Sequence, residues 1–89
     1  MVEPQTDLAI FRLFGWRCVE CGIRMATQLN HIILRSRDKS LIEDWRNKVP
    51  MCGPCHDDYH NGGVTEEKVQ SLQRKRAEAL IRMHKKDYI

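Results

Sequence analysis

Two short stretches decide the fold of this chain: residues 18–22 read CVECG, and residues 49–56 read VPMCGPCH. Each contains a Cys-x-x-Cys pair, a spacing that lets two thiolates from one tight turn reach the same tetrahedral metal ion. The pairs are Cys18 with Cys21 and Cys52 with Cys55. The spacing predicts that all four cysteines bind one structural zinc ion, which would join the two stretches.

Disulfide bonds are the alternative for an even number of cysteines in a short chain. They need an oxidising compartment. The chain opens at Met1 without the basic region and apolar run of a signal peptide. It also lacks any apolar stretch near the roughly 20 residues that span a bilayer. We therefore expect zinc, and a soluble, cytoplasmic protein with no membrane partner.

The length of 89 residues predicts a single domain over residues 1–89 with a marginal core, so a metal staple is needed. Fifteen Lys and Arg against twelve Asp and Glu give a net charge of +3. This balance is compatible with a polyanionic partner without requiring one.

Helix and strand signals alternate along the chain and predict a small α+β fold. Thr6 is a candidate N-cap and Gly15 a stop signal for a first helix, and Asn61-Gly62-Gly63 ends another. The expected elements are a helix over 6–15, a strand through His31, a loop over 35–40, a strand or extended segment over 47–51, a helix over 54–60 and a long amphipathic helix over 64–86.

Several side chains have simple structural interpretations. Trp16 and Trp45 are expected to be core aromatics beside the zinc. Asp57 and Asp58 are expected in the first turn of their helix, where they complement its dipole. The basic cluster over residues 74–76 is more typical of a solvated helix face than of a binding patch.

A second polar site is predicted around the histidines. His56 and His60 are four residues apart and so share one face of a helix. With the amide oxygen of Asn30 they could hold a divalent ion, while His31 has the pKa range of a general base. A base and a cation are what phosphodiester hydrolysis needs. A lone histidine is more often a packed residue, and Asn47 by itself is more typical of a turn or cap.

These motifs, in this order, resemble the HNH endonuclease family in its four-cysteine form. The resemblance covers residues 16–63 and rests on CVECG at 18–22, NHIILRSR at 30–37, NKVPMCGPCH at 47–56 and HNGG at 60–63. It implies a ββα-metal fold, in which two antiparallel strands and a helix hold one catalytic divalent ion, and DNA as the substrate.

Carried over by position, the resemblance implies a role for each site residue. His31 looks like the general base and Asn47 like the asparagine that pins the loop between the strands. His56 and His60 resemble ligands of the catalytic ion, which would be Mg²⁺, Mn²⁺, Ni²⁺ or Zn²⁺. Members usually have His or Asp before the base, so Asn30, with a neutral amide oxygen, predicts weaker metal binding and slower hydrolysis.

The remaining expectations concern partners. Arg35 and Arg37 lie where basic side chains would meet DNA phosphates. A chain this small would borrow sequence specificity from a protein partner, and the C-terminal helix is a candidate for dimerisation. Two other functions stay open: a DNA-binding module of the same fold in which Asn30 has weakened catalysis, and a zinc-ribbon-like interaction domain.

Overall fold

The computed structural model describes residues 4–34, 40 and 44–84. Along these residues the elements are α1 (Asp7–Leu13), β1 (Gln28–His31), the 3-10 helix η2 (Trp45–Asn47), β2 (Lys48–Met51), α2 (Gly53–His60) and α3 (Glu66–Met83). The predicted small α+β fold is confirmed, with a two-stranded antiparallel sheet and three α-helices in the described part of the chain.

The first helix, α1, begins where the sequence predicted. Thr6 is its N-cap, and the Thr6 hydroxyl accepts a hydrogen bond from the Ala9 amide at 3.1 Å. The chain leaves the helix through Gly15, whose φ of +66° is in the left-handed region that favours glycine. A Cβ at this position would lie 2.7 Å from the Cε of Met83, so the end of α1 packs closely against the end of α3.

The two strands form an antiparallel hairpin that carries the polar residues of interest. The register pairs Asn30 with Val49 and His31 with Lys48. Neighbouring residues on a strand project to opposite faces, so Asn30 and His31 lie on different faces of the sheet. All four residues of β2 are buried, which makes this strand the centre of the fold.

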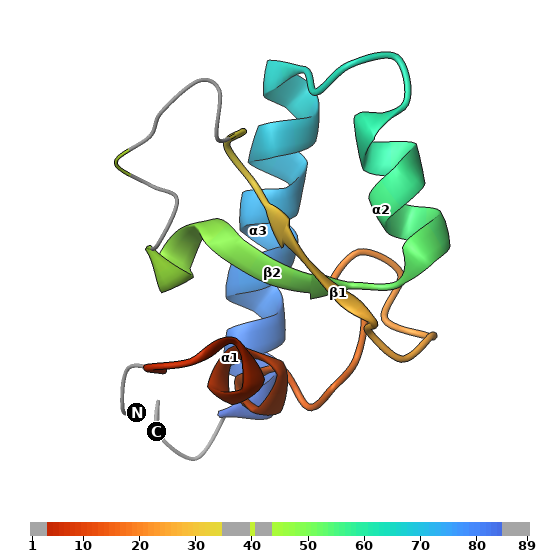
Figure 1. The fold of residues 1–89 in the computed structure, drawn as a ribbon. Helices are drawn as coiled ribbons and strands as arrows, with labels where there is room; N and C mark the ends of the chain where they lie inside the picture. Colours follow the sequence, from red (N-terminus) through yellow and green to blue (C-terminus); the bar gives the residue numbers. More distant parts are fainter. Residues whose placement is uncertain (1–3, 35–39, 41–43, 85–89) are drawn as a thin grey trace.

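The two helices that follow β2 are separated by a short turn. Pro54 lies in the first turn of α2, and Gly62 and Gly63 follow its end with positive φ angles. Thr65 then caps α3 by accepting a hydrogen bond from the Lys68 amide at 3.2 Å. The turn reverses the chain, so α2 and α3 run in opposite directions (Figure 1).

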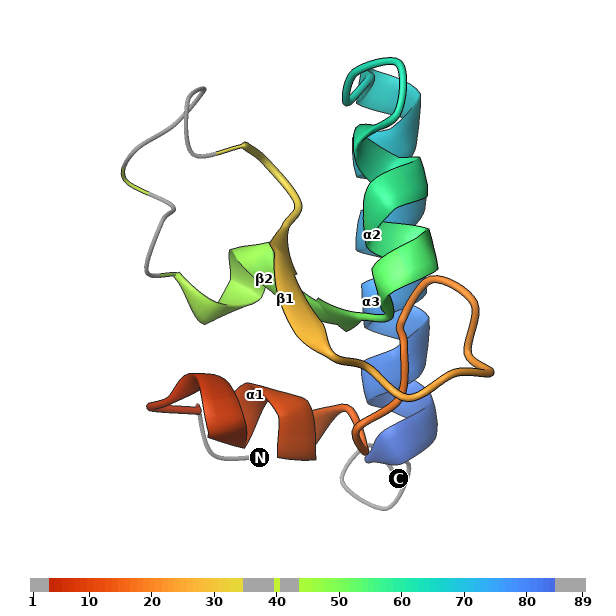
Figure 2. The ribbon, with the colours of Figure 1, turned by 45° about the vertical axis from the view of Figure 1, so that its right-hand side comes forward.

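The hairpin lies between the helices. In Figure 1 the strands cross in front of α3, and in Figures 1 and 2 α1 lies below the strands and α2 stands at the end of the sheet where β2 leads into it. The core joins side chains from all of these elements. It comprises Ile10, Phe14, Cys18, Val19, Ile32, Val49, Met51, Cys52, Tyr59, Val64, Val69, Leu72, Ala79 and Leu80.

The expectation for one of the two tryptophans was wrong. Trp16 is 38% exposed and stacks on Phe11 of α1, with ring centroids 5.1 Å apart. It is displaced from the core because the backbone turns at Trp16 itself, with a φ of +61°. Trp45 is partly buried against the core, and the Arg76 guanidinium lies 4.8 Å from its ring centroid.

None of the helices among the described residues is long and apolar enough to cross a membrane.

Candidate metal centre and nuclease site

The four cysteines converge on one point. Their sulfur atoms all lie within 4.8 Å of one another, and together they could hold a metal ion. Cys18 and Cys52 are buried, whereas Cys21 and Cys55 are partly exposed. The cluster confirms that the two pairs come together, as their spacing predicted.

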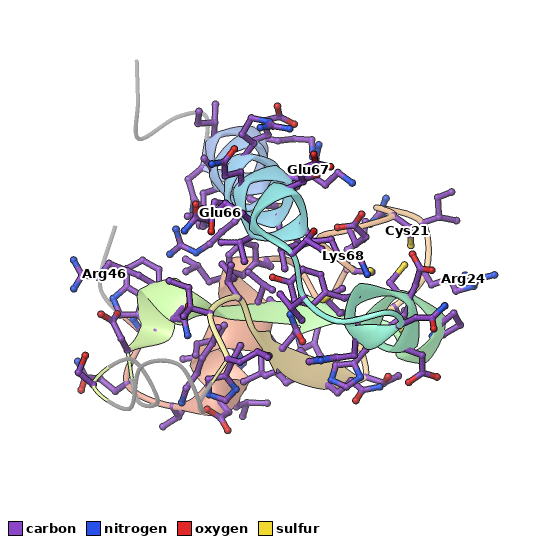
Figure 3. The ribbon with its side chains drawn as sticks, turned by 90° about the horizontal axis from the view of Figure 1, so that it is seen from above. Cys21, Arg24, Arg46, Glu66, Glu67 and Lys68 are labelled. Atoms are coloured by element: carbon purple, nitrogen blue, oxygen red, sulfur yellow. The ribbon has the colours of Figure 1, made fainter. Side chains whose placement is uncertain are left out.

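Backbone hydrogen bonds shape the first cysteine loop before any metal is considered. The Gly22 amide donates to the Cys18 carbonyl at 2.9 Å, and the Cys18 amide donates to the Arg24 carbonyl at 2.9 Å. Gly22 has a φ of +68°, so it supplies the tight turn after the second ligand. The Val19 amide donates to the Pro50 carbonyl of β2 at 3.0 Å, which attaches this loop to the strand that leads into the other pair. Figure 3 shows Cys21 and Arg24 in this loop beside α2.

The electrostatics of the cluster suit a bound cation. The backbone amides of Arg24 and Ile23 lower the pKa of Cys21 to about 6. Burial raises the pKa of both Cys18 and Cys55. Four thiolates this close would repel one another unless a cation stood between them. An all-sulfur ligand set fits a borderline-soft cation and not Mg²⁺ or Ca²⁺, which prefer oxygen.

A second polar cluster joins β1 to α2. Asn30 is 1% exposed, and its Oδ1 lies 2.9 Å from Nε2 of His60. His56, one turn earlier on α2, has its ring centroid 4.6 Å from that of His60. The Nδ2 of Asn30 is buried without a hydrogen-bond partner among the described residues. An amide N–H is a hydrogen-bond donor, so this nitrogen is not a metal ligand; the atoms of the cluster that could hold a divalent ion are the Asn30 oxygen and the two imidazoles.

Partial burial of its ring, followed by the charges of His56 and Lys68, lowers the pKa of His60. The His60 imidazole is therefore neutral at physiological pH, the form that binds a metal ion. His56 and His60 line an open hollow together with Pro54, Asp57, Asp58 and Asn61.

The placement of Asp57 and Asp58 in the first turn of their helix was wrong. Because α2 begins at Gly53, these residues lie in its second turn, and the first turn contains no acidic residue. Both side chains are exposed.

Asn47 holds the backbone that follows His31. Its Oδ1 accepts from the Ile33 amide at 2.9 Å, and its Nδ2 donates to the Ile33 carbonyl at 3.0 Å. The Asn47 carbonyl also accepts from the Ile32 amide at 2.8 Å. Asn47 thus fastens two segments of the chain 14 residues apart.

His31 is not in the cluster that contains Asn30 and His60. It lines a different hollow, on the face of the sheet that α1 covers, together with Asp7, Phe11 and Lys48. Asn30 and His31 are therefore neighbours in sequence, but their side chains lie on opposite faces of the strand. Arg35 and Arg37 lie outside the described residues.

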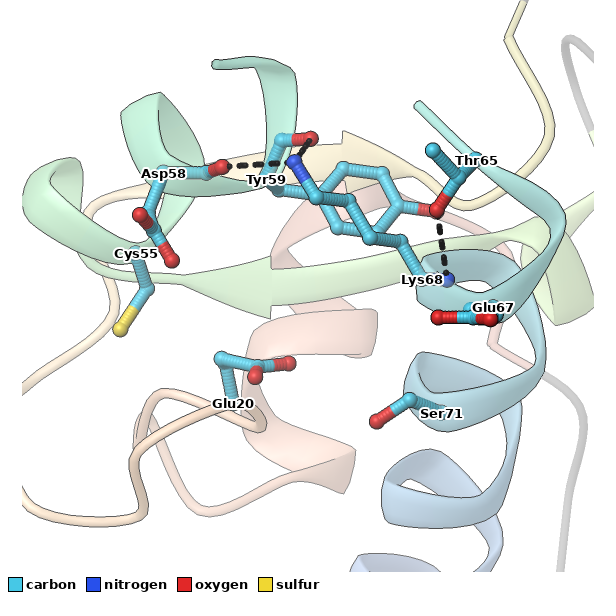
Figure 4. Close-up of a pocket in the computed structure, with 8 residues that line it drawn as sticks. All are labelled: Glu20, Cys55, Asp58, Tyr59, Thr65, Glu67, Lys68 and Ser71. Carbon is cyan, nitrogen blue, oxygen red and sulfur yellow. Dashed lines mark hydrogen bonds between the residues drawn. The ribbon is translucent and has the colours of Figure 1, made fainter. Parts of the chain in front are cut away.

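Two residues that support the site had no signal in the sequence analysis. The Tyr59 hydroxyl is buried and donates to the Ile32 carbonyl at 2.7 Å, which ties α2 to the backbone after His31. Lys68 of α3 donates to carbonyls at the end of α2, including that of Asn61 at 2.7 Å. Figure 4 shows its bonds to the carbonyls of Asp58 and Tyr59, each at 3.1 Å. An amphipathic pattern places Lys68 on a helix, but it does not show which carbonyls it will reach.

The comparisons with known proteins point to one family. The family model described as HNH endonuclease matches residues 18–62, just over half of the chain. No curated protein and no solved structure matches the chain. The matched segment runs from the first cysteine through both strands to the turn after α2. It therefore contains the four cysteines and the cluster of Asn30, His56 and His60. The chain belongs to the HNH endonuclease family.

Proposed function

We propose that this protein is a metal-dependent endonuclease that hydrolyses phosphodiester bonds of DNA, with His31 as the general base. The observation that carries the proposal is the convergence of Asn30, His56 and His60 next to a strand end whose backbone is held on several sides. A neutral amide oxygen and two imidazoles are ligands for a divalent ion. The cysteine cluster, in this proposal, holds a structural zinc ion.

The chain's own residues supply the rest of the chemistry. When bound by Asn30, His56 and His60, a divalent ion would offset the negative charge that builds on the phosphate and on the leaving 3′ oxygen. His31 takes the proton from the attacking water, a task for which an imidazole nitrogen supplies the acceptor lone pair.

Orientation of the base comes from its neighbours. Three described hydrogen bonds from Asn47 and one from Tyr59 hold Ile32 and Ile33, the two residues after His31. A fixed backbone limits the positions that the imidazole can take, which is what a general base needs. The proposed phosphate contacts of Arg35 and Arg37 remain predictions from the resemblance.

A DNA-binding module with weak catalysis is the second candidate, and Asn30 is the observation that favours it. Its amide brings no negative charge to the metal site, and its oxygen is already hydrogen-bonded to His60 at 2.9 Å. A weaker site would bind the ion less tightly and lower the rate of hydrolysis.

Nicking of a supercoiled plasmid distinguishes the two functions. The wild-type chain, with zinc retained, is incubated with plasmid in Mg²⁺, Mn²⁺ or Ni²⁺. The nuclease proposal expects nicking that falls about 10²–10⁴-fold in His31→Ala. His84→Ala is the matched control, because His84 lies at the C-cap of α3 and contacts Leu13. DNA binding without nicking in any of the metals would leave the binding module as the function.

Substitution of Asn30 tests the metal site separately. Asn30→Asp adds a negative charge and is expected to tighten Mn²⁺ binding, measured by calorimetry, and to raise the nicking rate. Asn30→His is expected to act in the same direction by adding a nitrogen donor. If Mn²⁺ affinity stays the same in both variants, Asn30 is not a ligand.

A further inference from the structure

Lys48 is a buried charged residue to which the proposed mechanism gives no role. Three polar side chains are buried in the described part of the chain: Asn30, Asn47 and Lys48. Asn30 belongs to the proposed metal site and Asn47 to the loop that it fastens. Burial of an ammonium group is costly unless it is well paired. The surroundings of Lys48 therefore need an explanation.

Lys48 lies directly across the sheet from His31. The two are register partners in the antiparallel pair, and such partners project from the same face with Cβ atoms about 4.5–5.5 Å apart. Both line one cavity of about 310 Å³, which Asp7 and Phe11 of α1 line on the other side. The ammonium group thus shares a cavity with the imidazole that we propose as the base.

The end of the Lys48 side chain contacts a carboxylate that faces solvent. Nζ lies 3.4 Å from Oδ1 of Asp7, and the Lys48 side chain is 11% exposed whereas that of Asp7 is 69% exposed. Because an exposed carboxylate reaches the ammonium, Nζ lies near the open side of the cavity. A distance of 3.4 Å is longer than the about 2.7–2.9 Å of a strong charge-assisted hydrogen bond. This contact is weak enough for another anion to replace it.

The charges on the two faces of the sheet differ. The hollow at His56 and His60 is also lined by Asp57 and Asp58, so its side-chain charge is negative unless a divalent ion is bound. Among the described residues, Lys48 is the only lysine or arginine that lines the cavity at His31. The positive charge that the described residues place next to the proposed base therefore comes from Lys48.

We propose that Lys48 is a phosphate-binding residue of this nuclease. Its ammonium group binds a non-bridging oxygen of the DNA phosphodiester beside His31, and Asp7 is the carboxylate that contacts it before DNA binds. The inference rests on the proposed function, because that function brings a phosphodiester to His31.

Opposite effects of two substitutions test the inference. Lys48→Met removes the phosphate contact, whereas Asp7→Asn removes the competing carboxylate. DNA binding is measured on a short duplex over a range of KCl concentrations without added divalent ion, and nicking is measured on supercoiled plasmid. Lys75→Met is the matched control, since it also lowers the net charge of +3 by one and breaks an ion pair, with Glu20, outside the cavity.

We expect Lys48→Met to reduce nicking at least about tenfold and to lower the slope of log affinity against log salt by about one. We expect Asp7→Asn to bind the duplex severalfold more tightly. Lys48→Arg keeps the charge and should retain most of the salt slope. If Lys48→Met does not fold, the Asp7→Asn result decides, and unchanged or weaker binding overturns the inference.

Equal salt slopes and nicking rates in Lys48→Met and Lys75→Met would show that Lys48 is only part of a structural ion pair. A wild-type chain that binds DNA but never nicks it would refute the nuclease function instead. The salt slopes would then still decide whether Lys48 contacts the phosphate backbone.

Discussion

Asn47→Ala tests whether the loop after His31 is held in the way that the structure indicates. Asn47 is 6% exposed and makes two side-chain hydrogen bonds to Ile33, one to its amide and one to its carbonyl. Alanine leaves both backbone groups without these partners in a partly buried position. A buried polar group that loses its partner costs about 1–3 kcal/mol, so the two together predict a loss of about 2–6 kcal/mol in the free energy of unfolding. This is a large share of the roughly 5–15 kcal/mol that stabilises a typical domain.

The measurement is urea unfolding at a fixed zinc concentration, because a bound metal contributes to the measured stability. Asn61→Ala is the control, since Asn61 is exposed and the same substitution there should change the free energy of unfolding by less than about 0.5 kcal/mol. A loss below about 1 kcal/mol in Asn47→Ala would refute the reasoning, because the two hydrogen bonds would then not hold the loop.

Three further predictions follow from the same contacts. Lys68→Met removes the ammonium group that four carbonyls at the end of α2 share, and should lower the free energy of unfolding by about 1–3 kcal/mol in the same urea assay. An unchanged midpoint of urea unfolding would show that water replaces the Lys68 ammonium group at these carbonyls. Tyr59→Phe leaves the Ile32 carbonyl without its buried partner and should cost about 1–3 kcal/mol, with a slower nicking rate per folded molecule; no change in either would contradict the positioning role. Removal of metal by a strong chelator should abolish the helical circular dichroism signal in parallel with zinc release, because the cysteine cluster joins two segments more than 30 residues apart; helical signal that persists after full zinc release would contradict this.

The sequence by itself determined the features that depend on near neighbours. The Cys-x-x-Cys spacing predicted the four-cysteine cluster, since two ligands three residues apart reach one ion from a single turn. Thr6 and Thr65 predicted the helix starts because a cap contacts an amide three residues away. The family followed from the order of motifs over residues 18–62.

Tertiary structure alone decided which residues far apart in the chain meet. Tyr59 reaches a carbonyl 27 residues away, and Lys48 an aspartate 41 residues away, and no local pattern encodes either contact. The placement of His31 also needed the hairpin register, which puts it on the face opposite Asn30 and beside Lys48. Side-chain types and spacings state what chemistry is present, but the packing of helices on the sheet determines which groups share a cavity. For this chain that packing separates the proposed base from the proposed metal ligands by the thickness of one strand.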